Sequence, residues 1–534
     1  MSADPATEAA RRRTFAIISH PDAGKTTLTE ALLLAGGAIH LAGQVRARGE
    51  SRRTRSDWMK IERERGISVS ASVMTFEHQG LVFNLLDTPG HEDFSEDTYR
   101  TLTAADSAVM VLDAAKGIEP QTLKLFEVCR LRDIPITTFI NKMDREALDP
   151  FELLDEVQQK LAMDTAPMFW PAGSGQRFAG MFDFEADEFV PYQRLEAGEQ
   201  GFSDTARSKR SAPDFMAGVD DALRAEAEES AELAREGLPR FELAAFREGH
   251  LTPVYFGSAL RRFGVLELLA GLGAHAPSPR ALSASIKGAD AEVAPDRSEV
   301  SGFVFKVQAN MDLKHRDRVA FFRVSSGRFQ RGMTLKTAAG KGFNVHNPLM
   351  FMAQEREIAD EAFPGDVIGI PNHGGLRVGD SLSQSGDVVF KGIPNFAPEI
   401  LKRVRVRDPL KQKHLRRALE ALGEEGVTQV FKPVSGGDIV VGAVGALQFD
   451  VLDERIKAEY GLDAVFEQSP YQAARWVSAD TEPALKSFIE KSTAQMAEDV
   501  DGAPVFLGKS EWEIGYVQEK NPDVRFSAAK ERAA

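Results

Sequence analysis

The chain contains a single cysteine, Cys129, among its 534 residues. One thiol cannot form an internal disulfide, and it cannot supply a metal site built from several cysteines. Sparse cysteine is typical of proteins from a reducing compartment. We therefore expect a cytoplasmic protein.

Long apolar runs are also missing from the sequence. No uninterrupted apolar segment reaches the roughly 18 to 20 residues that a bilayer-spanning helix requires. The first residues, Met1–Arg13, include basic side chains but no apolar run behind them, so we expect no secretory signal in them. We expect no membrane partner.

Positive charge is in short supply overall, with 65 Lys and Arg against 80 Asp and Glu and a net charge of −15. Taken over the whole chain, this balance argues against a nucleic-acid partner, and we expect no DNA partner. The charge is uneven, however, because 46–65 and 402–417 are rich in Arg and Lys, whereas 211–236 is acidic. Each basic stretch is either a solvated surface or a face that meets RNA.

The 534 residues of the chain allow two to four domains. The first part of the chain alternates short apolar runs with helical patterns. The expected strands are apolar almost throughout, which is typical of a parallel sheet covered by helices on both faces. They are Phe15–Ser19, Leu81–Asp87, Ala108–Asp113 and Ile136–Ile140.

The periodicity changes after Asp144. A helix is expected over Pro150–Met163, and a further buried strand over Pro253–Gly257. We therefore predict an inserted subdomain at about 150–250, with its acidic stretch on the surface. The run Ala276–Pro279 and the polar residues up to Arg297 predict a linker.

The remaining chain predicts two smaller domains. Short strands with glycine turns between Val300 and Ser383 are typical of a β-barrel. From Ile400 to Glu467 the order β-α-β-β-α-β predicts a ferredoxin-like unit. No internal repeat is visible, and we expect 528–534 to be frayed.

One segment between the first strand and a helix matches a phosphate-binding loop, except that Ser19 replaces the usual first glycine. Consecutive backbone N–H groups at a helix N-terminus can cradle phosphates. Lys25 would lie between the β- and γ-phosphates, and the Thr26 hydroxyl would bind Mg²⁺. The alternative is a chance match in a turn. The expected nucleotide-binding residues here are Ser19, His20, Pro21, Asp22, Ala23, Gly24, Lys25, Thr26 and Thr27.

A second motif, Asp87-Thr88-Pro89-Gly90-His91, ends the strand Leu81–Asp87. Asp87 could hold Mg²⁺ through a water, and the Gly90 N–H could reach the γ-phosphate. His91 would then lie near the attacking water, although a lone histidine is more often a surface residue. Between these motifs, Ser68 could give Mg²⁺ a second hydroxyl.

A third motif, Asn141-Lys142-Met143-Asp144, follows the strand Ile136–Ile140. The Asp144 carboxylate could accept bonds from guanine N1–H and its 2-amino group, which adenine lacks. Ser258 and Ala259 could offer a backbone N–H to the guanine oxygen, although this pair alone is a weak signal. Together the motifs predict a GTP hydrolase that binds GTP, GDP and Mg²⁺.

The predicted fold is an α/β P-loop GTPase domain with an inserted subdomain, followed by a β-barrel domain and a ferredoxin-like α+β C-terminal domain. Their expected limits are 12–280, 281–392 and 393–534.

The residues around two of these motifs resemble the translational GTPases. The marks of that family are His91 directly after the Asp87–Gly90 run, and the Arg65-Gly66-Ile67 segment. The resemblance implies that His91 is catalytic, orienting water in a site that the large-subunit RNA of the ribosome completes. Family members usually carry threonine where this chain has Ser68.

Within that family the chain is similar to the release factors along nearly its whole length. It lacks room for the two further C-terminal domains of elongation factor G, whose first three domains it resembles, and elongation factor Tu has no comparable insertion. The specific stretches are Lys306–Asp312, Lys314–Phe321, Arg407–Lys413 and Gly442–Gln448.

This resemblance implies a monomeric, ribosome-dependent GTPase of translation termination. Its partners would be ribosomal RNA and proteins, and the stop-codon-reading release factors, whose dissociation it promotes after peptide release. Two rivals remain open: a translocase-like factor, and a nucleotide-gated binding protein that hardly hydrolyses GTP.

Overall fold

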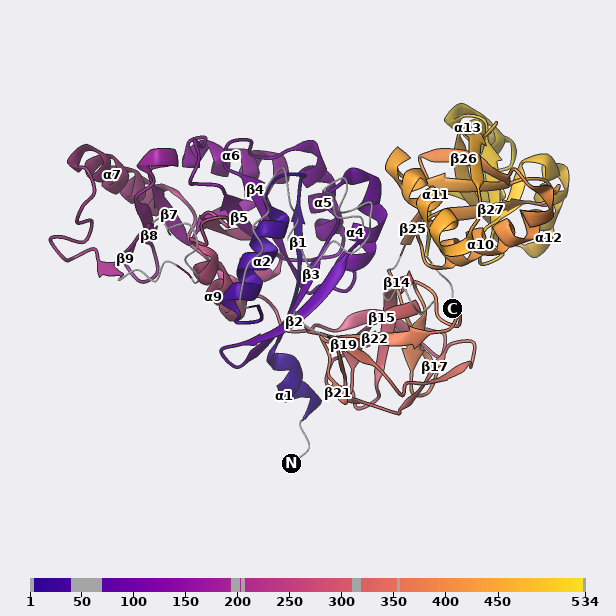
Figure 1. The fold of residues 1–534 in the computed structure, drawn as a ribbon, viewed down its shortest axis with the longest axis horizontal. Helices are drawn as coiled ribbons and strands as arrows, with labels where there is room; N and C mark the ends of the chain where they lie inside the picture. Colours follow the sequence, from indigo (N-terminus) through magenta and orange to yellow (C-terminus); the bar gives the residue numbers. More distant parts are fainter. Residues whose placement is uncertain are drawn as a thin grey trace.

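The computed structural model describes residues 4–39, 70–193, 202, 207–309, 318–352, 356–392 and 394–531. An α/β domain carries the N-terminus, a β-rich domain lies beneath it, and an α+β domain packs beside both (Figure 1). Within the described ranges, no helix has the length and apolar character needed to cross a membrane.

The N-terminal domain is built on a seven-stranded sheet of order β2-β3-β1-β4-β5-β11-β6. Only β2 runs antiparallel to its neighbour. The expected strands of this sheet are confirmed. The strands are β1 (Arg12–Ser19), β2 (Ser72–His78), β3 (Leu81–Asp87), β4 (Ser107–Asp113), β5 (Ile136–Asn141), β6 (Asp164–Pro167) and β11 (Leu251–Phe256).

Helices cover both faces of this sheet because successive strand residues point to opposite sides. Ile17 and Ile18 lie on opposite faces of the sheet, and each packs in a core that a different pair of helices covers. The first pair is α2 (Lys25–Ala35) and α9 (Val265–His275), and the second is α4 (Ser95–Leu102) and α5 (Pro120–Leu131).

The insertion is smaller than the stretch 150–250 that the sequence suggests. Helix α6 (Pro150–Leu161) packs beside α5, and β6 adds to the main sheet. The separate part begins only at Met168, and the buried Trp170 packs on Phe151 and Phe256 of the main domain. It comprises β7 (Phe169–Ala172), β8 (Gly180–Asp183), β9 (Glu188–Pro191), β10 (Ser208–Lys209), α7 (Asp221–Gly237) and α8 (Leu243–Arg247).

Most of the middle domain is an eight-stranded antiparallel sheet of order β18-β17-β23-β14-β15-β22-β19-β20, with a small β16-β21 pair. The strands are β14 (Ser301–Ala309), β15 (Arg318–Ser326), β16 (Phe329–Gln330), β17 (Thr334–Thr337), β18 (Gly342–Asn344), β19 (Leu349–Phe351), β20 (Arg356–Ile358), β21 (Glu361–Ala362), β22 (Val367–Asn372) and β23 (Ser381–Ser383).

The expected linker up to Arg297 is wrong. This stretch forms a hairpin of β12 (Leu282–Ile286) and β13 (Ala289–Val293), which pairs with β24 (Val388–Phe390). Lys287 and Gly288 make the turn with φ values of +52° and +82°. Ala284 and Val293 are buried, whereas the polar residues between them face outward. The alternation of apolar and polar residues that would predict strands is therefore weak in this stretch.

The C-terminal domain begins with the predicted ferredoxin-like unit, which is confirmed. Its elements are β26 (Ile400–Val406), α10 (Gln412–Glu424), β27 (Gln429–Pro433), β28 (Ile439–Ala443), α11 (Ala446–Tyr460) and β29 (Ala464–Gln468). A second unit then repeats the same β-α-β-β-α-β order. It contains β30 (Ala473–Ala479), α12 (Glu482–Lys491), β31 (Met496–Glu498), β32 (Pro504–Gly508), α13 (Glu511–Lys520) and β33 (Val524–Ser527).

The two units share one sheet of order β29-β26-β28-β27-β31-β32-β30-β33, in which each half has the same strand order. The expectation of no internal repeat is therefore wrong at the level of topology. Strand residues that do not face the helices, such as Phe431, Val440, Trp476 and Val505, form a common core. The helices thus lie outside and the helix-free faces meet.

Residues 528–531 are ordered, contrary to the fraying expected for 528–534, and 532–534 lie outside the described residues. Strand β34 (Ala529–Glu531) pairs antiparallel with β25 (Pro394–Phe396), which lies just before the C-terminal domain. This pairing ties the C-terminal segment to the connection between the middle and C-terminal domains.

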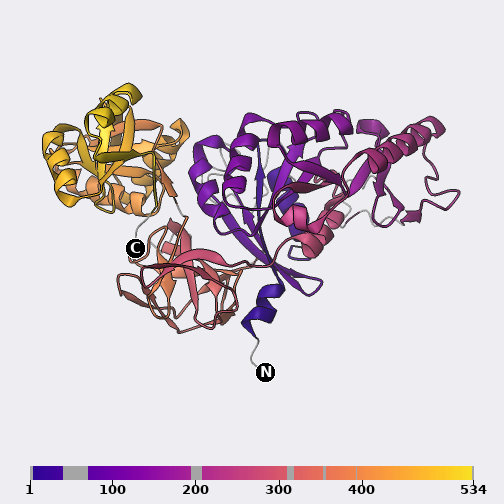
Figure 2. The same cartoon turned by 180° about the vertical axis from the view of Figure 1, so that it is seen from behind.

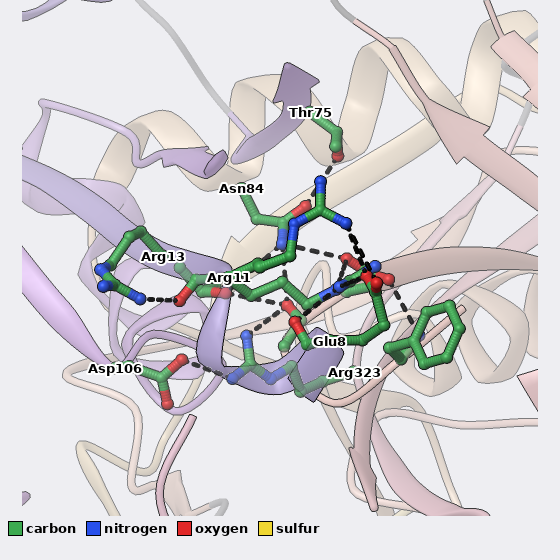
Figure 3. Close-up of polar contacts among 12 residues, drawn as sticks. Glu8, Arg11, Arg13, Thr75, Asn84, Asp106 and Arg323 are labelled. Atoms are coloured by element: carbon green, nitrogen blue, oxygen red, sulfur yellow. Dashed lines mark hydrogen bonds and ion pairs between the residues drawn. The ribbon is translucent and has the colours of Figure 1, made fainter. Parts of the chain in front are cut away.

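A buried polar network joins the N-terminal and middle domains (Figure 3). Arg12 Nε donates to Asp366 Oδ1 at 2.8 Å, and Arg323 Nη2 donates to Asp106 Oδ2 at 2.6 Å. The carbonyl oxygen of Gly365 accepts bonds from Thr14 and Arg323. These contacts lie near the amino ends of β1 and β4, so they leave the carboxyl edge of the sheet free for a ligand.

Candidate nucleotide-binding site

The residues expected to form the phosphate loop connect β1 to α2 at the carboxyl edge of the sheet. Gly24 has a φ of +98°, and a Cβ there would lie 2.3 Å from Asn141 Nδ2, so both backbone and space require glycine. Ser19 is buried, and its hydroxyl donates to the His20 carbonyl at 2.9 Å. Pro21 and Asp22 are exposed, Ala23 is buried, and Thr26 and Thr27 lie in the first turn of α2.

Lys25 and Asp87 come together beside this loop. Lys25 Nζ lies 2.5 Å from Asp87 Oδ1, and both side chains are buried. A Cβ on Gly90 would come within 3.7 Å of Lys25 Cε, so the Asp87–His91 run passes close to the lysine. Thr88 holds the run against β1, because its hydroxyl donates to the Ile17 carbonyl at 2.6 Å. The Pro89 carbonyl accepts from Thr98.

The oxygen groups here suit Mg²⁺, which binds through one or two protein oxygens, water and substrate phosphates. A hydroxyl at Thr26 and a carboxylate at Asp87 are such groups. In the part of the chain that the structure describes, no three His, Cys, Asp or Glu side chains cluster as a metal site. Ser68 and the Arg65–Ile67 segment lie outside the described residues.

His91 lies at the rim of the site, with 36% of its side chain exposed. Its Nδ1 accepts a bond from the Asp93 backbone N–H at 3.3 Å and lies 3.6 Å from Asp93 Oδ1. Because Nδ1 is the acceptor, the neutral ring carries its hydrogen on Nε2 and can donate from there.

The two motifs that are expected to bind guanine meet through Asn141. Its Nδ2 donates to the Ala23 carbonyl at 2.8 Å, and its Oδ1 accepts from the Ala259 N–H at 2.9 Å. The Ser258 hydroxyl donates to Asp144 Oδ1 at 2.6 Å. Three motifs that are far apart in sequence are thus held together at one edge of the sheet.

Met143 has a different place from its neighbours. Its side chain is fully buried in the core, its N–H donates to the Gly257 carbonyl at 3.1 Å, and its carbonyl accepts from Gly175 at 2.9 Å. Met143 therefore fixes the backbone of the motif and does not present its side chain to a ligand.

Asp113, at the end of β4, was missed by the sequence interpretation. Lys142 Nζ lies 2.6 Å from Asp113 Oδ2 and donates to the Asp22 carbonyl at 2.5 Å. Burial alone would raise the pKa of Asp113, but hydrogen bonds from Lys142 and the Ala115 N–H hold it below its ordinary value. The sequence signal that could have identified Asp113 is its position as an acidic residue at the end of a buried parallel strand.

Glu119 was also missed. The buried His20 places its Nε2 2.9 Å from Glu119 Oε2, although without hydrogen-bond geometry. Burial lowers the pKa of His20, and the Glu119 carboxylate opposes that shift. His20 is therefore part of the packed base of the loop.

Three protein families match successive parts of the chain. The elongation factor Tu GTP-binding domain matches 10–278, and domain 2 of elongation factor G matches 299–385. The C-terminal domain of the class II release factor RF3 matches 390–518. Together they show a GTPase domain, an elongation-factor-G-like second domain and a release-factor C-terminal domain.

Whole-chain comparisons agree with this assignment. The chain is 51% identical over 529 residues to peptide chain release factor 3 of Bordetella avium (strain 197N), covering 98% of this chain and 97% of that one. It also resembles a crystal structure of a Thermus thermophilus protein, with 26% identity and a TM-score of 0.67 over 88% of this chain and 71% of that one. The chain therefore belongs to the peptide chain release factor 3 family of translation-termination GTPases, which bind and hydrolyse GTP.

Proposed function

We propose that this GTPase binds the ribosome after peptide release and promotes dissociation of the stop-codon-reading release factors. Hydrolysis of GTP then allows the protein itself to leave. The 51% identity to a protein named peptide chain release factor 3, over 98% of the chain, supports this role. We further propose a cytoplasmic monomer with domain limits of 12–280, 281–392 and 393–534.

The convergence of Lys25, Asp87 and Gly90 at the phosphate loop is the observation that carries the proposed catalysis. GTP or GDP would bind this loop and the two guanine motifs, with Mg²⁺ held by Thr26, Asp87 and Ser68. A bound Mg²⁺ would neutralise charge on the phosphates. The proposed nucleotide-binding residues are Ser19, His20, Pro21, Asp22, Ala23, Gly24, Lys25, Thr26, Thr27, Asp87, Thr88, Pro89, Gly90, Asn141, Lys142, Met143, Asp144, Ser258 and Ala259.

His91 is the proposed catalytic residue. It follows Gly90 directly, so a phosphate that meets the Gly90 N–H brings its attacking water near the imidazole. With Nδ1 occupied by the Asp93 N–H, the neutral ring can donate from Nε2. His91 would therefore orient the water by donating a hydrogen bond, since phosphoryl transfer depends mainly on positioning and charge stabilisation.

A basic face on the C-terminal domain supports an RNA partner in an otherwise acidic protein. Between Val406 and Leu419 the only acid is Asp408, which caps the short helix η3 (Pro409–Lys411). The exposed cations of this face are Arg407, Lys411, Lys413, Arg416 and Arg417. Phosphate contacts by such a face make binding weaker as salt rises.

The proposed role is tested by measuring GTP turnover with and without ribosomes, together with release-factor dissociation from post-termination ribosomes. We expect slow turnover alone, strong stimulation by ribosomes, and faster dissociation when GTP is present. Stimulated turnover with release factors still bound would favour a translocase-like factor. Turnover that ribosomes leave unchanged would favour a nucleotide-gated binding protein.

A further inference from the structure

Helix α11 of the C-terminal domain lacks a capping side chain of its own. Gly445 occupies the N-cap position, where other helices use an Asp or Ser oxygen to accept the first backbone N–H groups. The Gln448 side chain accepts from the Val444 N–H at 2.7 Å and from the Gly445 N–H at 3.4 Å. The Leu447 N–H, one residue before Gln448, still needs an acceptor.

Asp93 of the N-terminal domain supplies that acceptor. Its Oδ2 accepts from the Leu447 N–H at 2.7 Å, across 354 residues of sequence. The N-terminal end of a helix is positive, so a carboxylate there is stabilising. Asp93 thus supplies the capping side chain for a helix that belongs to another domain.

The fit between Asp93 and Gly445 leaves no room for a side chain. A Cβ on Gly445 would lie 2.0 Å from Asp93 Cγ and 2.2 Å from Asp93 Oδ1. The φ of Gly445 is −136°, which any residue can adopt. Space, and not backbone conformation, therefore requires glycine at this position.

A second contact has the opposite charge and meets the other end of a helix. Arg100, at the end of α4, donates from Nη1 to the Gly426 carbonyl at 2.9 Å, just beyond the C-terminal end of α10. The buried Arg100 is paired with Glu96 at 2.5 Å. A Cβ on Gly426 would lie 2.2 Å from Arg100 Nη1. The segment from Asp93 to Arg100 therefore contacts two helix ends, and the charge of each side chain is complementary to the helix end that it meets.

Asp93 also contacts the proposed catalytic histidine. Its backbone N–H donates to His91 Nδ1 at 3.3 Å, while its carboxylate reaches Leu447. We propose that Asp93 is a positioning residue that makes the orientation of His91 depend on the placement of the C-terminal domain. When that domain moves away, Asp93 loses its partner and the imidazole loses its fixed position. This inference rests on the catalytic role proposed for His91.

The test compares Gly445→Ala with Gly515→Ala. The first change leaves the N-terminal domain intact but forces Asp93 and α11 apart. Gly515 lies in α13 of the same domain with no neighbouring atom within 4 Å of a new Cβ, so it is a matched control. Probes on cysteines introduced at the exposed Asp155 and Asp463 report the distance between domains, because the native Cys129 is buried.

We expect Gly445→Ala to change that distance and to lower ribosome-stimulated kcat about tenfold, with KM for GTP within about twofold of wild type. Asp93→Ala should behave alike, whereas Asp93→Asn, whose amide oxygen can still accept from Leu447, should recover most of kcat. Gly515→Ala should match wild type in both measurements.

Two results would overturn the inference: an unchanged distance in Gly445→Ala, or a changed distance with wild-type kcat. His91→Ala is measured in parallel. If His91→Ala is slow and Gly445→Ala is normal, only the positioning role fails. If His91→Ala itself hydrolyses normally, the proposed function of His91 fails, and the distance measurement still reports whether Asp93 holds the domains.

Discussion

At the scale of single residues, Asp144 offers the sharpest test of nucleotide choice. Asp144→Asn should lose affinity for GTP and gain affinity for xanthine nucleotides, whose 2-oxo group requires a donor. A lost hydrogen bond to a charged group costs about 1.5–3 kcal/mol, so GTP should bind roughly ten- to a hundredfold more weakly. Equilibrium binding of both nucleotides checks this, with the exposed Asp155→Asn as the control. Unchanged GTP affinity would refute the assignment.

His20 should make stability depend on pH. Its pKa is lowered in the folded protein by burial, against the opposing Glu119 carboxylate, so the unfolded chain takes up a proton more readily. Stability is therefore fully present above the unfolded pKa of about 6.5 and is lost as pH falls toward the lowered folded pKa. His20→Gln should show a smaller drop in unfolding midpoint between pH 7.5 and 5.5 than wild type. Equal drops would show that another group titrates.

Residues of the candidate site were predictable where one local motif contained the chemistry. Gly24 and Lys25 belong to such a motif, and the residue spacing of that motif predicts a phosphate loop. The contacts of Asp113, Glu119 and Asp93 were not predictable, because their partners come from other elements or another domain. Sequence order does not reveal contacts of that kind.

At the scale of elements, apolar runs predicted the buried strands of the main sheet, since helices cover both faces. The β12–β13 hairpin was missed because its buried positions are few and its outer residues are polar. The second ferredoxin-like unit was missed because it repeats the first in topology and not in sequence. The relation becomes visible only in the shared strand order.

Helix α7 provides a prediction about the acidic stretch. Deleting all of 150–250 would also remove α6 and β6 from the main domain, so charge removal is the cleaner change. Figures 1 and 2 show α7 at the end of the molecule opposite the C-terminal domain. Neutralising the exposed Glu229 and Glu236 to Gln should keep GTP affinity within about twofold in calorimetry, because surface charges act weakly through water. A larger change would place α7 near the nucleotide.

At the scale of the whole molecule, the buried network should make the N-terminal and middle domains unfold together. Arg323→Leu leaves the buried Asp106 without its partner, which costs about 3–5 kcal/mol. We expect the unfolding of the two domains to separate into distinct calorimetric transitions. Arg323→Leu combined with Asp106→Leu removes both charges and should recover most of the loss. A single transition with the wild-type midpoint in Arg323→Leu would contradict this coupling.

The C-terminal domain is joined differently, through the Asp93–Arg100 segment beside the candidate site and through ion pairs with the middle domain. Arg377 contacts Glu424 and Asp501, and Arg318 contacts Glu425. Both arginines lie on the middle domain and all three acids on the C-terminal domain, so the placements of these two domains are linked. The candidate nucleotide site therefore lies beside a contact between domains, and a movement of the C-terminal domain would change that contact.

Single-turnover GTP hydrolysis by His91→Ala on ribosomes tests the central claim most directly. In the proposed site the phosphate loop would hold the nucleotide but not the water, so the variant should bind GTP within about twofold of wild type. Its hydrolysis should slow by on the order of a hundredfold, since misplacing the attacking group has effects of that size. The variant should also remain on the ribosome in its GTP-bound form. A wild-type rate would contradict the account, because another group or the ribosome alone would then have to place the water.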